Sequence, residues 1–447
     1  MKNKYWYIIL LAFFSVAVSF VVVKFKSQQQ LNNNTTYILL PRTGNSTTEE
    51  WKTAKINTDK LLAKIKANSS DTKAGLALAN AYIAEARISG NTAYYDKAAL
   101  NTVDNILSKE PANYEALMLR ALLQLSQHHF ADGLATAKTA ENINPNNAFV
   151  YGLLVDANVE MGNYDAALEA ADKMVSIRPD LRSYSRIAYL REIHGDYPGA
   201  VDAMKLAVQA GITAEETTEW CRAQLGRLYE NMGDIQNAGL QYNLSLAARP
   251  GYANALAGLG RIATHQKKYD SAVYYYEQAN NFINNFGIQQ NLALAHSNAG
   301  QAEKANTINK EVIAAMNKTA AISNDDPAAG HYSDKELAYA YLQNHNYDKA
   351  LQHALAEYNR RPKNIDINET MAWVYYKRNE TEKALPYLNA ALVTHSMNPV
   401  LLCTAGLIYA QTGNAEKGKL MLKLALKHNP IMPDEIKKES TATLQKL

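Results

Sequence analysis

Few residues in this 447-residue sequence combine the types and spacings that carry chemistry. The clearest is the run GLGRIA at residues 258–263, which has the G-x-G-x-x-A spacing of a dinucleotide fingerprint. That motif binds a pyrophosphate only where a strand leads into a helix, because the amides of the helix N-terminus hold the phosphates. Residues 258–263 lie inside a helical pattern instead. We therefore expect packing glycines there, and no nucleotide cofactor.

The ten histidines include no H-E-x-x-H pair. His128, His129, His194 and His345 fall between predicted helices, where a solvated polar residue is the expected role. His345 and His353 could approach each other, but no carboxylate cluster accompanies them. The pair Asp325-Asp326 lacks the alternating oxygen ligands of a calcium loop. No metal site is expected.

Nucleophilic and redox chemistry also lack a sequence signature. Cys221 and Cys403 are the only cysteines, too few for a disulfide framework or a cysteine-based zinc site, and we interpret them as buried thiols. No G-x-S-x-G, phosphate loop or Cys/His pairing is present. The sequence therefore predicts neither an enzyme nor a small-molecule substrate.

Charge and composition indicate an all-α protein with a large core. The 46 basic and 43 acidic residues nearly cancel, so no concentrated basic face is available for nucleic acid. Only 12 prolines and 21 glycines are present, while 47% of residues are hydrophobic. These numbers favour closely packed helices.

Internal repeats decide how those helices are arranged. The segments 158–167, 228–238 and 341–350 align with one another, each with a polar turn and a following alanine. A proline follows each alanine at a similar distance, at Pro179, Pro250 and Pro362. Equivalent positions recur every 33 to 34 residues through most of the chain.

This pattern resembles the tetratricopeptide repeat, in which helix A, a tight turn and helix B end at a proline. Small residues recur where paired helices meet, as at Gly226, Gly260 and Ala238, and turn signals recur at Gly162, Gly195, Gly233, Gly300 and Gly413. The resemblance implies a right-handed superhelical solenoid of about ten repeats.

The domain organisation follows from the same frame. Repeats are predicted at 114–147, 148–180, 181–214, 219–252, 253–285, 286–318, 331–364, 365–398 and 399–432, after a degenerate unit near 72–111 with a lengthened loop at 89–91. About seven repeats thus span 71–320 and three span 331–432, separated by an insertion loop at 321–330. Predicted capping helices at 47–70 and 433–447 cover the two ends of the array.

The N-terminus predicts an anchor. Lys2 and Lys4 precede an uncharged apolar run at 5–23, whose nineteen residues would form about 28 Å of helix, close to the bilayer core. A cleaved signal peptide is the alternative, with a small-x-small site at 17–19. We favour an uncleaved single-pass anchor at 1–26, a polar linker at 27–46, and a body on the exported, periplasmic or extracytoplasmic, side of a membrane.

The resemblance implies that protein or peptide partners bind the concave groove, which helix A lines at repeat positions 2, 5, 9, 12 and 13. The expected partner-binding residues are Tyr189, Trp220, Arg227, Glu230, Arg261, His265, Tyr332, Tyr339, Trp373, Tyr376 and Lys377. The predicted function is a membrane-anchored scaffold or adaptor. The alternatives are an accessory subunit of an envelope enzyme or transporter complex and, third, a glycan-binding surface.

Overall fold

In the computed structural model, residues 14, 36–44, 48–325 and 331–447 are described. These residues form 22 α-helices and no strand, which confirms the all-α prediction. None of the helices in this part of the chain is long and apolar enough to span a bilayer. The predicted anchor at 1–26 lies, except for Phe14, outside the described residues.

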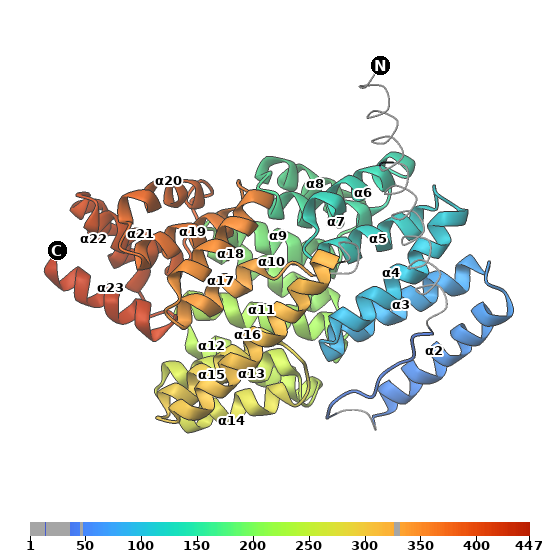
Figure 1. Ribbon diagram of the computed structural model, residues 1–447, viewed down its shortest axis with the longest axis horizontal. Helices are drawn as coiled ribbons and strands as arrows, with labels where there is room; N and C mark the ends of the chain where they lie inside the picture. The colour runs from blue at the N-terminus through green and yellow to red at the C-terminus, as the bar shows by residue number, and fades with distance from the viewer. Residues whose placement is uncertain (1–13, 15–35, 45–47, 326–330) are drawn as a thin grey trace, which may run out of the picture.

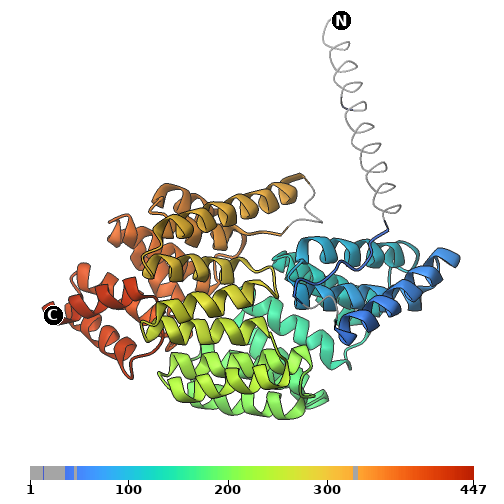
Figure 2. The ribbon, with the colours of Figure 1, turned by 90° about the horizontal axis from the view of Figure 1, so that it is seen from below.

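Twenty of the helices form ten antiparallel A–B hairpins, which stack side by side in a curved array (Figures 1 and 2). The pairs are α3 (Thr72–Ser89) with α4 (Thr92–Lys109), α5 (Tyr114–Ser126) with α6 (Phe130–Ile143), α7 (Ala148–Glu160) with α8 (Tyr164–Ile177), α9 (Leu181–Ile193) with α10 (Tyr197–Ala210), α11 (Glu216–Asn231) with α12 (Ile235–Ala248), α13 (Ala253–His265) with α14 (Tyr269–Asn280), α15 (Phe286–Asn298) with α16 (Ala302–Asp325), α17 (Asp334–Gln343) with α18 (Tyr347–Arg360), α19 (Ile365–Lys377) with α20 (Thr381–Ala391), and α21 (Pro399–Gln411) with α22 (Ala415–Leu426).

Asparagine caps start many of the A helices. The Asn113 side chain accepts a hydrogen bond from the Ala116 amide at 3.0 Å, and Asn147, Asn364 and Asn398 cap α7, α19 and α21 in the same way. Each cap satisfies a backbone amide that has no partner within its helix. The repeat boundaries are therefore set locally, residue by residue.

Small residues let the paired helices approach closely. A Cβ on Gly260 would lie 2.8 Å from the Tyr276 ring, and one on Gly258 would overlap the Tyr242 ring. Both tyrosines are buried, with exposed fractions of 0% for Tyr242 and 3% for Tyr276. The G-x-G-x-x-A run thus lies within α13 and serves helix packing.

The structure differs from the sequence prediction at three places. In the first hairpin only Gly90 and Asn91 separate α3 from α4, so the loop there is not lengthened. Helix α16 continues to Asp325, which makes the first part of the predicted insertion loop helical. Residues 36–44, assigned to a polar linker, pack against the first hairpin: Leu39 is buried, and the Leu40 amide donates to the Tyr95 hydroxyl at 2.9 Å.

Helices α2 (Glu49–Ala67) and α23 (Asp434–Lys446) flank the hairpins. Thr48 caps α2 by accepting from the Trp51 amide, and α2 packs against α3. At the other end, Ile436 of α23 is buried among side chains of α21 and α22. Both helices cover an end of the array that a neighbouring repeat would otherwise cover.

The superhelix is wound so tightly that its second turn touches its first. We call α3–α12 the first turn and α13–α22 the second turn. In each hairpin of the first turn, the loop between helix A and helix B contacts a second loop, which follows the hairpin five places further along the chain. We call this line of contact the seam. The loop after α18 accordingly meets the turn between α7 and α8, where the Ile365 amide contacts the Tyr164 hydroxyl.

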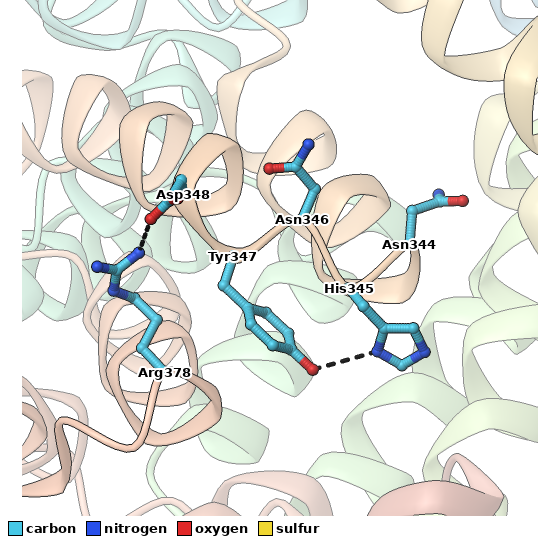
Figure 3. A pocket seen from close by; sticks show the side chains of 6 residues that line it. All are labelled: Asn344, His345, Asn346, Tyr347, Asp348 and Arg378. Carbon is cyan, nitrogen blue, oxygen red and sulfur yellow. Dashed lines mark hydrogen bonds and ion pairs between the residues drawn. The ribbon is translucent and has the colours of Figure 1, made fainter.

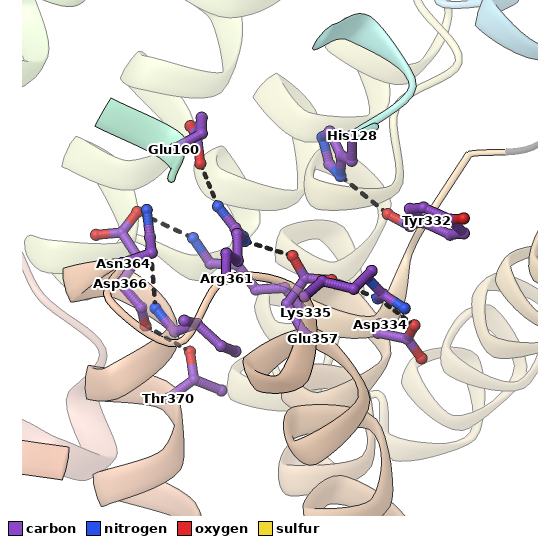
Figure 4. Close-up of polar contacts among 12 residues, drawn as sticks. His128, Glu160, Tyr332, Asp334, Lys335, Glu357, Arg361, Asn364, Asp366 and Thr370 are labelled. Carbon is purple, nitrogen blue, oxygen red and sulfur yellow. Dashed lines mark hydrogen bonds and ion pairs between the residues drawn. The ribbon is translucent and has the colours of Figure 1, made fainter. Parts of the chain in front are cut away.

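Backbone hydrogen bonds and an ion pair are among the contacts at the seam. The Asn284 amide donates to the Ser89 carbonyl at 3.0 Å, and the Ile431 amide donates to the Glu230 carbonyl at 3.2 Å. Near the middle, the Ile365 amide donates to the Tyr164 hydroxyl at 2.8 Å. Arg361 pairs with Glu160, 201 residues away in sequence (Figure 4).

Candidate functional site

A cavity of about 1560 Å³ lies on the concave side of the first turn. We call it the first-turn cavity. The A helices α3, α5, α7, α9 and α11 supply most of its wall, and Glu50 of α2 and Arg249 close one side. Apolar lining residues include Leu76, Ile83, Met118, Leu122, Phe149, Leu181 and Trp220. A hollow with an apolar floor and a charged rim is the usual form of a protein-binding surface.

Most charges around this cavity are already paired. Arg186 forms a bidentate ion pair with Asp156, with a shortest distance of 2.5 Å, and Arg87 pairs with Glu216 at 3.0 Å. Arg249 reaches Glu50 at 3.0 Å. These pairs fix side chains that would otherwise rotate freely in the cavity.

Among the described arginines that line this cavity, Arg182 is the exception. Its guanidinium forms no hydrogen bond or ion pair with any residue in the described ranges, and it lies 5.1 Å from the centre of the Phe149 ring. Burial, together with the neighbouring Arg186, Arg87 and Arg178, lowers its pKa although Asp180 opposes this effect. A partly buried guanidinium without an ion-pair partner would be stabilised by an added anion.

A second group of charges faces the same interior from the second turn. Lys335 of α17 pairs with Asp366 of α19 at 3.1 Å (Figure 4). Lys335, with a smaller effect from Arg227 of α11, lowers the pKa of Asp366. Burial, with Asp366 as the next cause, raises the pKa of Glu369 to about 8. The interior therefore has a mixed polar surface rather than a single sign of charge.

The structure places three of the predicted groove residues in the first-turn cavity: Tyr189, Trp220 and Arg227. The Tyr189 side chain is 36% exposed as a whole. Desolvation of its hydroxyl group raises the pKa of Tyr189. The Arg227 guanidinium lies 4.0 Å from the Glu192 carboxylate, which leaves it only loosely held.

Three further predicted residues are engaged within the chain near α13. Glu230 is buried, accepts from the Tyr242 hydroxyl at 2.6 Å and pairs with Arg261 at 2.8 Å. His265 lies 3.3 Å from the amide group of Asn429, in the loop that follows α22. Their polar groups hold helices and turns together.

Tyr332 and Tyr339 contact neighbouring side chains as well. Tyr332 stacks on His129 with ring centres 4.3 Å apart, and the Arg360 guanidinium lies 4.3 Å from the centre of the Tyr332 ring. The Tyr339 hydroxyl lies 3.3 Å from the Thr370 hydroxyl. His129 is only 7% exposed, so its interpretation as a solvated turn residue is wrong.

The last three predicted residues lie under the C-terminal helix. Trp373 stacks on Tyr376, whose hydroxyl donates to Glu439 of α23 at 2.7 Å. Lys377 lies over the Trp373 ring and pairs with Glu435 at 2.6 Å. In this structure α23 covers the part of the groove that these residues form.

Phe149 and Arg182 are absent from the predicted set, although the repeat frame contained the signal for both. Each occupies position 2 of its repeat, in the frames 148–180 and 181–214, and position 2 was expected to face the groove. What the frame could not show was that Arg182 lacks a partner, because this depends on the charges of three neighbouring helices.

A second hollow, of about 530 Å³, lies at the turn between α17 and α18 (Figure 3). Only six residues line it, among them Asn344, Asn346 and the ion pair of Asp348 with Arg378. His345 and the Tyr347 hydroxyl contact each other at 3.1 Å. The hollow is open to solvent and has almost no apolar wall, so it offers little for a partner to bury.

Comparisons with known proteins agree with this geometry. A family model of the tetratricopeptide repeat matches residues 224–282. No curated protein sequence matches the chain.

Several solved structures are similar over part of the chain. A type IV pilus biogenesis factor, PilW, is 16% identical, with 45% of this chain and 92% of that one covered and a TM-score of 0.38. A tetratricopeptide repeat protein from Parabacteroides merdae is 17% identical, with 59% and 98% covered and a TM-score of 0.33. The Cut9–Hcn1 hetero-tetramer of the APC/C gives 15% identity, 96% and 74% coverage and a TM-score of 0.39.

The family match falls on hairpins α11–α12 and α13–α14, whose helix-turn-helix geometry the other hairpins repeat. The described chain therefore has an all-α superhelical fold of helix-turn-helix hairpins, with a tetratricopeptide-repeat match at residues 224–282.

Proposed function

We propose that this protein is a membrane-anchored adaptor that binds a polypeptide segment in the first-turn cavity. The observation that carries the proposal is the unpaired Arg182 over Phe149, within a cavity of about 1560 Å³. Small-molecule sites usually enclose roughly 300–1,000 Å³. The larger volume favours a polypeptide occupant.

The side chains available in the cavity suit such a partner. Tyr189, Trp220 and Arg227 belong to the residue types that contribute most to binding energy at protein interfaces. Arg182 would pair with a carboxylate of the partner, because its guanidinium has no ion-pair partner among the described residues. The preferred ligand is therefore a segment with one acidic group next to an apolar or aromatic side chain.

The anchor at 1–26 would hold this cavity near a membrane, with the repeats on its exported side. Carrying no catalytic constellation in its sequence, the chain would position a partner and leave chemistry to that partner. This division of roles fits an adaptor better than an enzyme.

Photo-crosslinking in carbonate-washed membranes tests the proposal. A photoreactive phenylalanine analogue would replace Tyr189 in the cavity or, as a matched control, Tyr274, which is 57% exposed on α14. We expect the full chain to remain in the washed membranes, and Tyr189 to give a discrete crosslinked partner that Tyr274 does not give.

Arg182→Gln in the Tyr189 background should reduce that crosslink at least about tenfold, as loss of a charged interface anchor does. Arg191→Gln removes a half-exposed arginine that pairs with Asp196, and it should leave the yield of the Tyr189 crosslink unchanged. Crosslinks from Tyr274 alone, or a Tyr189 crosslink indifferent to Arg182→Gln, would place the binding surface elsewhere.

A further inference from the structure

Three potential metal ligands meet at the seam. One ring nitrogen each of His128 and His331 and one carboxylate oxygen of Glu336 all lie within 4.8 Å of one another. His128 occupies the turn between α5 and α6 in the first superhelical turn. His331 lies just before α17 and Glu336 in its first turn of helix, both in the second superhelical turn. The seam thus joins side chains separated by about 200 residues in sequence.

The two imidazoles are oriented by backbone carbonyl groups. His128 Nδ1 contacts the Tyr332 carbonyl oxygen at 2.9 Å (Figure 4), and the His331 ring forms a hydrogen bond with the Ser126 backbone. A neutral histidine that donates one N–H to a carbonyl keeps a lone pair on its other nitrogen. Histidines that bind metals in proteins are almost always held in this way.

The two imidazole rings lie against each other across the seam, with their ring centres 4.1 Å apart. Metal binding requires the neutral form of histidine.

Glu336 gives an independent indication of a cation site. Its Oε2 atom is buried from solvent and has no hydrogen-bond partner among the described residues. Leaving a carboxylate oxygen both dry and unpaired is costly. A cation between this oxygen and the two imidazoles would remove that cost.

The nearby positive charges do not prevent such a cation from binding. Arg361 and Lys335 act on His128, but Arg361 is neutralised by Glu160 and Glu357, and Lys335 pairs with Asp366 at 3.1 Å. The charge at the ligands themselves therefore comes mainly from Glu336.

The geometry points to a divalent transition-metal site formed by His128, His331 and Glu336, with zinc as the reference ion. Two imidazoles and one carboxylate are ligands that Zn²⁺ accepts, at bond lengths of about 2.0–2.2 Å. Small side-chain rotations would bring the three atoms to those distances. Water would take the fourth position, and the metal would fasten the second superhelical turn to the first.

Isothermal titration of the tag-free full chain with ZnCl₂ tests the site. We expect one Zn²⁺ per chain and a rise in Tm on binding. His128→Asn and Glu336→Gln should each weaken binding at least about tenfold. Co²⁺ in place of Zn²⁺ should give visible d–d absorption that both substitutions remove.

The control is His345→Asn. His345 and His128 both have a positive φ, of 56° and 63°, in the A–B turns of their hairpins, so asparagine suits the two positions equally. His345 is solvent-exposed, and its substitution should not change binding. Glu336→Gln without metal should keep the wild-type circular dichroism and Tm, which separates loss of a ligand from loss of the fold.

Absence of stoichiometric zinc binding would overturn the assignment. So would binding that survives His128→Asn, or binding that His345→Asn weakens as much.

Discussion

At the residue scale, Asp96 is a buried carboxylate with few interactions to offset the cost of burying its charge. It is 4% exposed, and its one hydrogen bond comes from the Ser126 hydroxyl at 2.9 Å. Burial raises its pKa from 3.8 to about 6, and the bond from Ser126 only partly opposes that rise. Because the folded pKa lies above the unfolded one, the folded state binds this proton more tightly. Stability from Asp96 is therefore present at low pH and is lost as pH rises from about 4 through 6.

Asp96→Asn should stabilise the protein at pH 7.5 by about 1–3 kcal/mol, since a pKa difference of roughly two units corresponds to that free energy. Urea unfolding followed by circular dichroism measures the effect. The gain should shrink as the pH is lowered toward 4, where the native aspartic acid is itself neutral. Asp202→Asn, at a side chain 76% exposed, is the control and should change little at either pH. A gain independent of pH would contradict the titration of Asp96.

At the element scale, the glycines of the A–B turns divide into two groups. Gly162 and Gly300 both have a positive φ, of 75° and 78°. A Cβ on Gly162 would overlap the Lys363 backbone across the seam, whereas a Cβ on Gly300 would meet nothing within 4 Å. Gly90, Gly195 and Gly233 resemble Gly162, and Gly413 resembles Gly300. Glycines of the first group end their helices and also leave room for the backbone of the second superhelical turn. Glycines of the second group only end their helices.

Gly162→Ala should therefore cost about 1–3 kcal/mol more than Gly300→Ala. Both substitutions carry the same left-handed strain, so their difference reports the contact at the seam. Urea midpoints of the two variants, measured side by side, give this difference. Equal midpoints would mean that the seam is not packed at Lys363.

Much of the structure at the element scale, above all where the A helices begin, could be predicted from the sequence. The repeat frame began units at 114, 148, 181, 253, 286, 365 and 399, where α5, α7, α9, α13, α15, α19 and α21 begin, because caps and turn residues act locally. The two kinds of turn glycine could not be told apart, since Gly162 and Gly300 have similar neighbours in sequence. Only the fold brings Lys363 to one of them.

At the scale of the whole molecule, the superhelix closes on itself. The pitch of the superhelix is the sum of small rotations between successive hairpins. Contacts between residues about 200 positions apart depend on that sum, so no local sequence pattern predicts them. That is why His128 was interpreted as a solvated turn residue and Glu160 was not connected with Arg361. It is also why the predicted groove extended over both turns, whereas the first-turn cavity is lined by residues of the first turn, with Glu50 and Arg249 at its edge.

The seam also explains how one chain can hold both a rigid body and an open cavity. The second turn is fastened to the first by Arg361, Asn364 and Ile365, while the concave side of α3–α11 keeps its hollow. An adaptor built in this way would present a preformed surface, which lowers the ordering cost of binding.

Pulsed electron spin resonance between labels on cysteines at positions 165 and 363 tests the closed superhelix most directly. Asp165 and Lys363 are solvent-exposed on opposite sides of the seam, and the native Cys221 and Cys403 are buried. A single short and narrow distance distribution is predicted, which Gly162→Ala should broaden. A broad distribution at long distances in the unmutated background would contradict the account, because the two superhelical turns would then not touch.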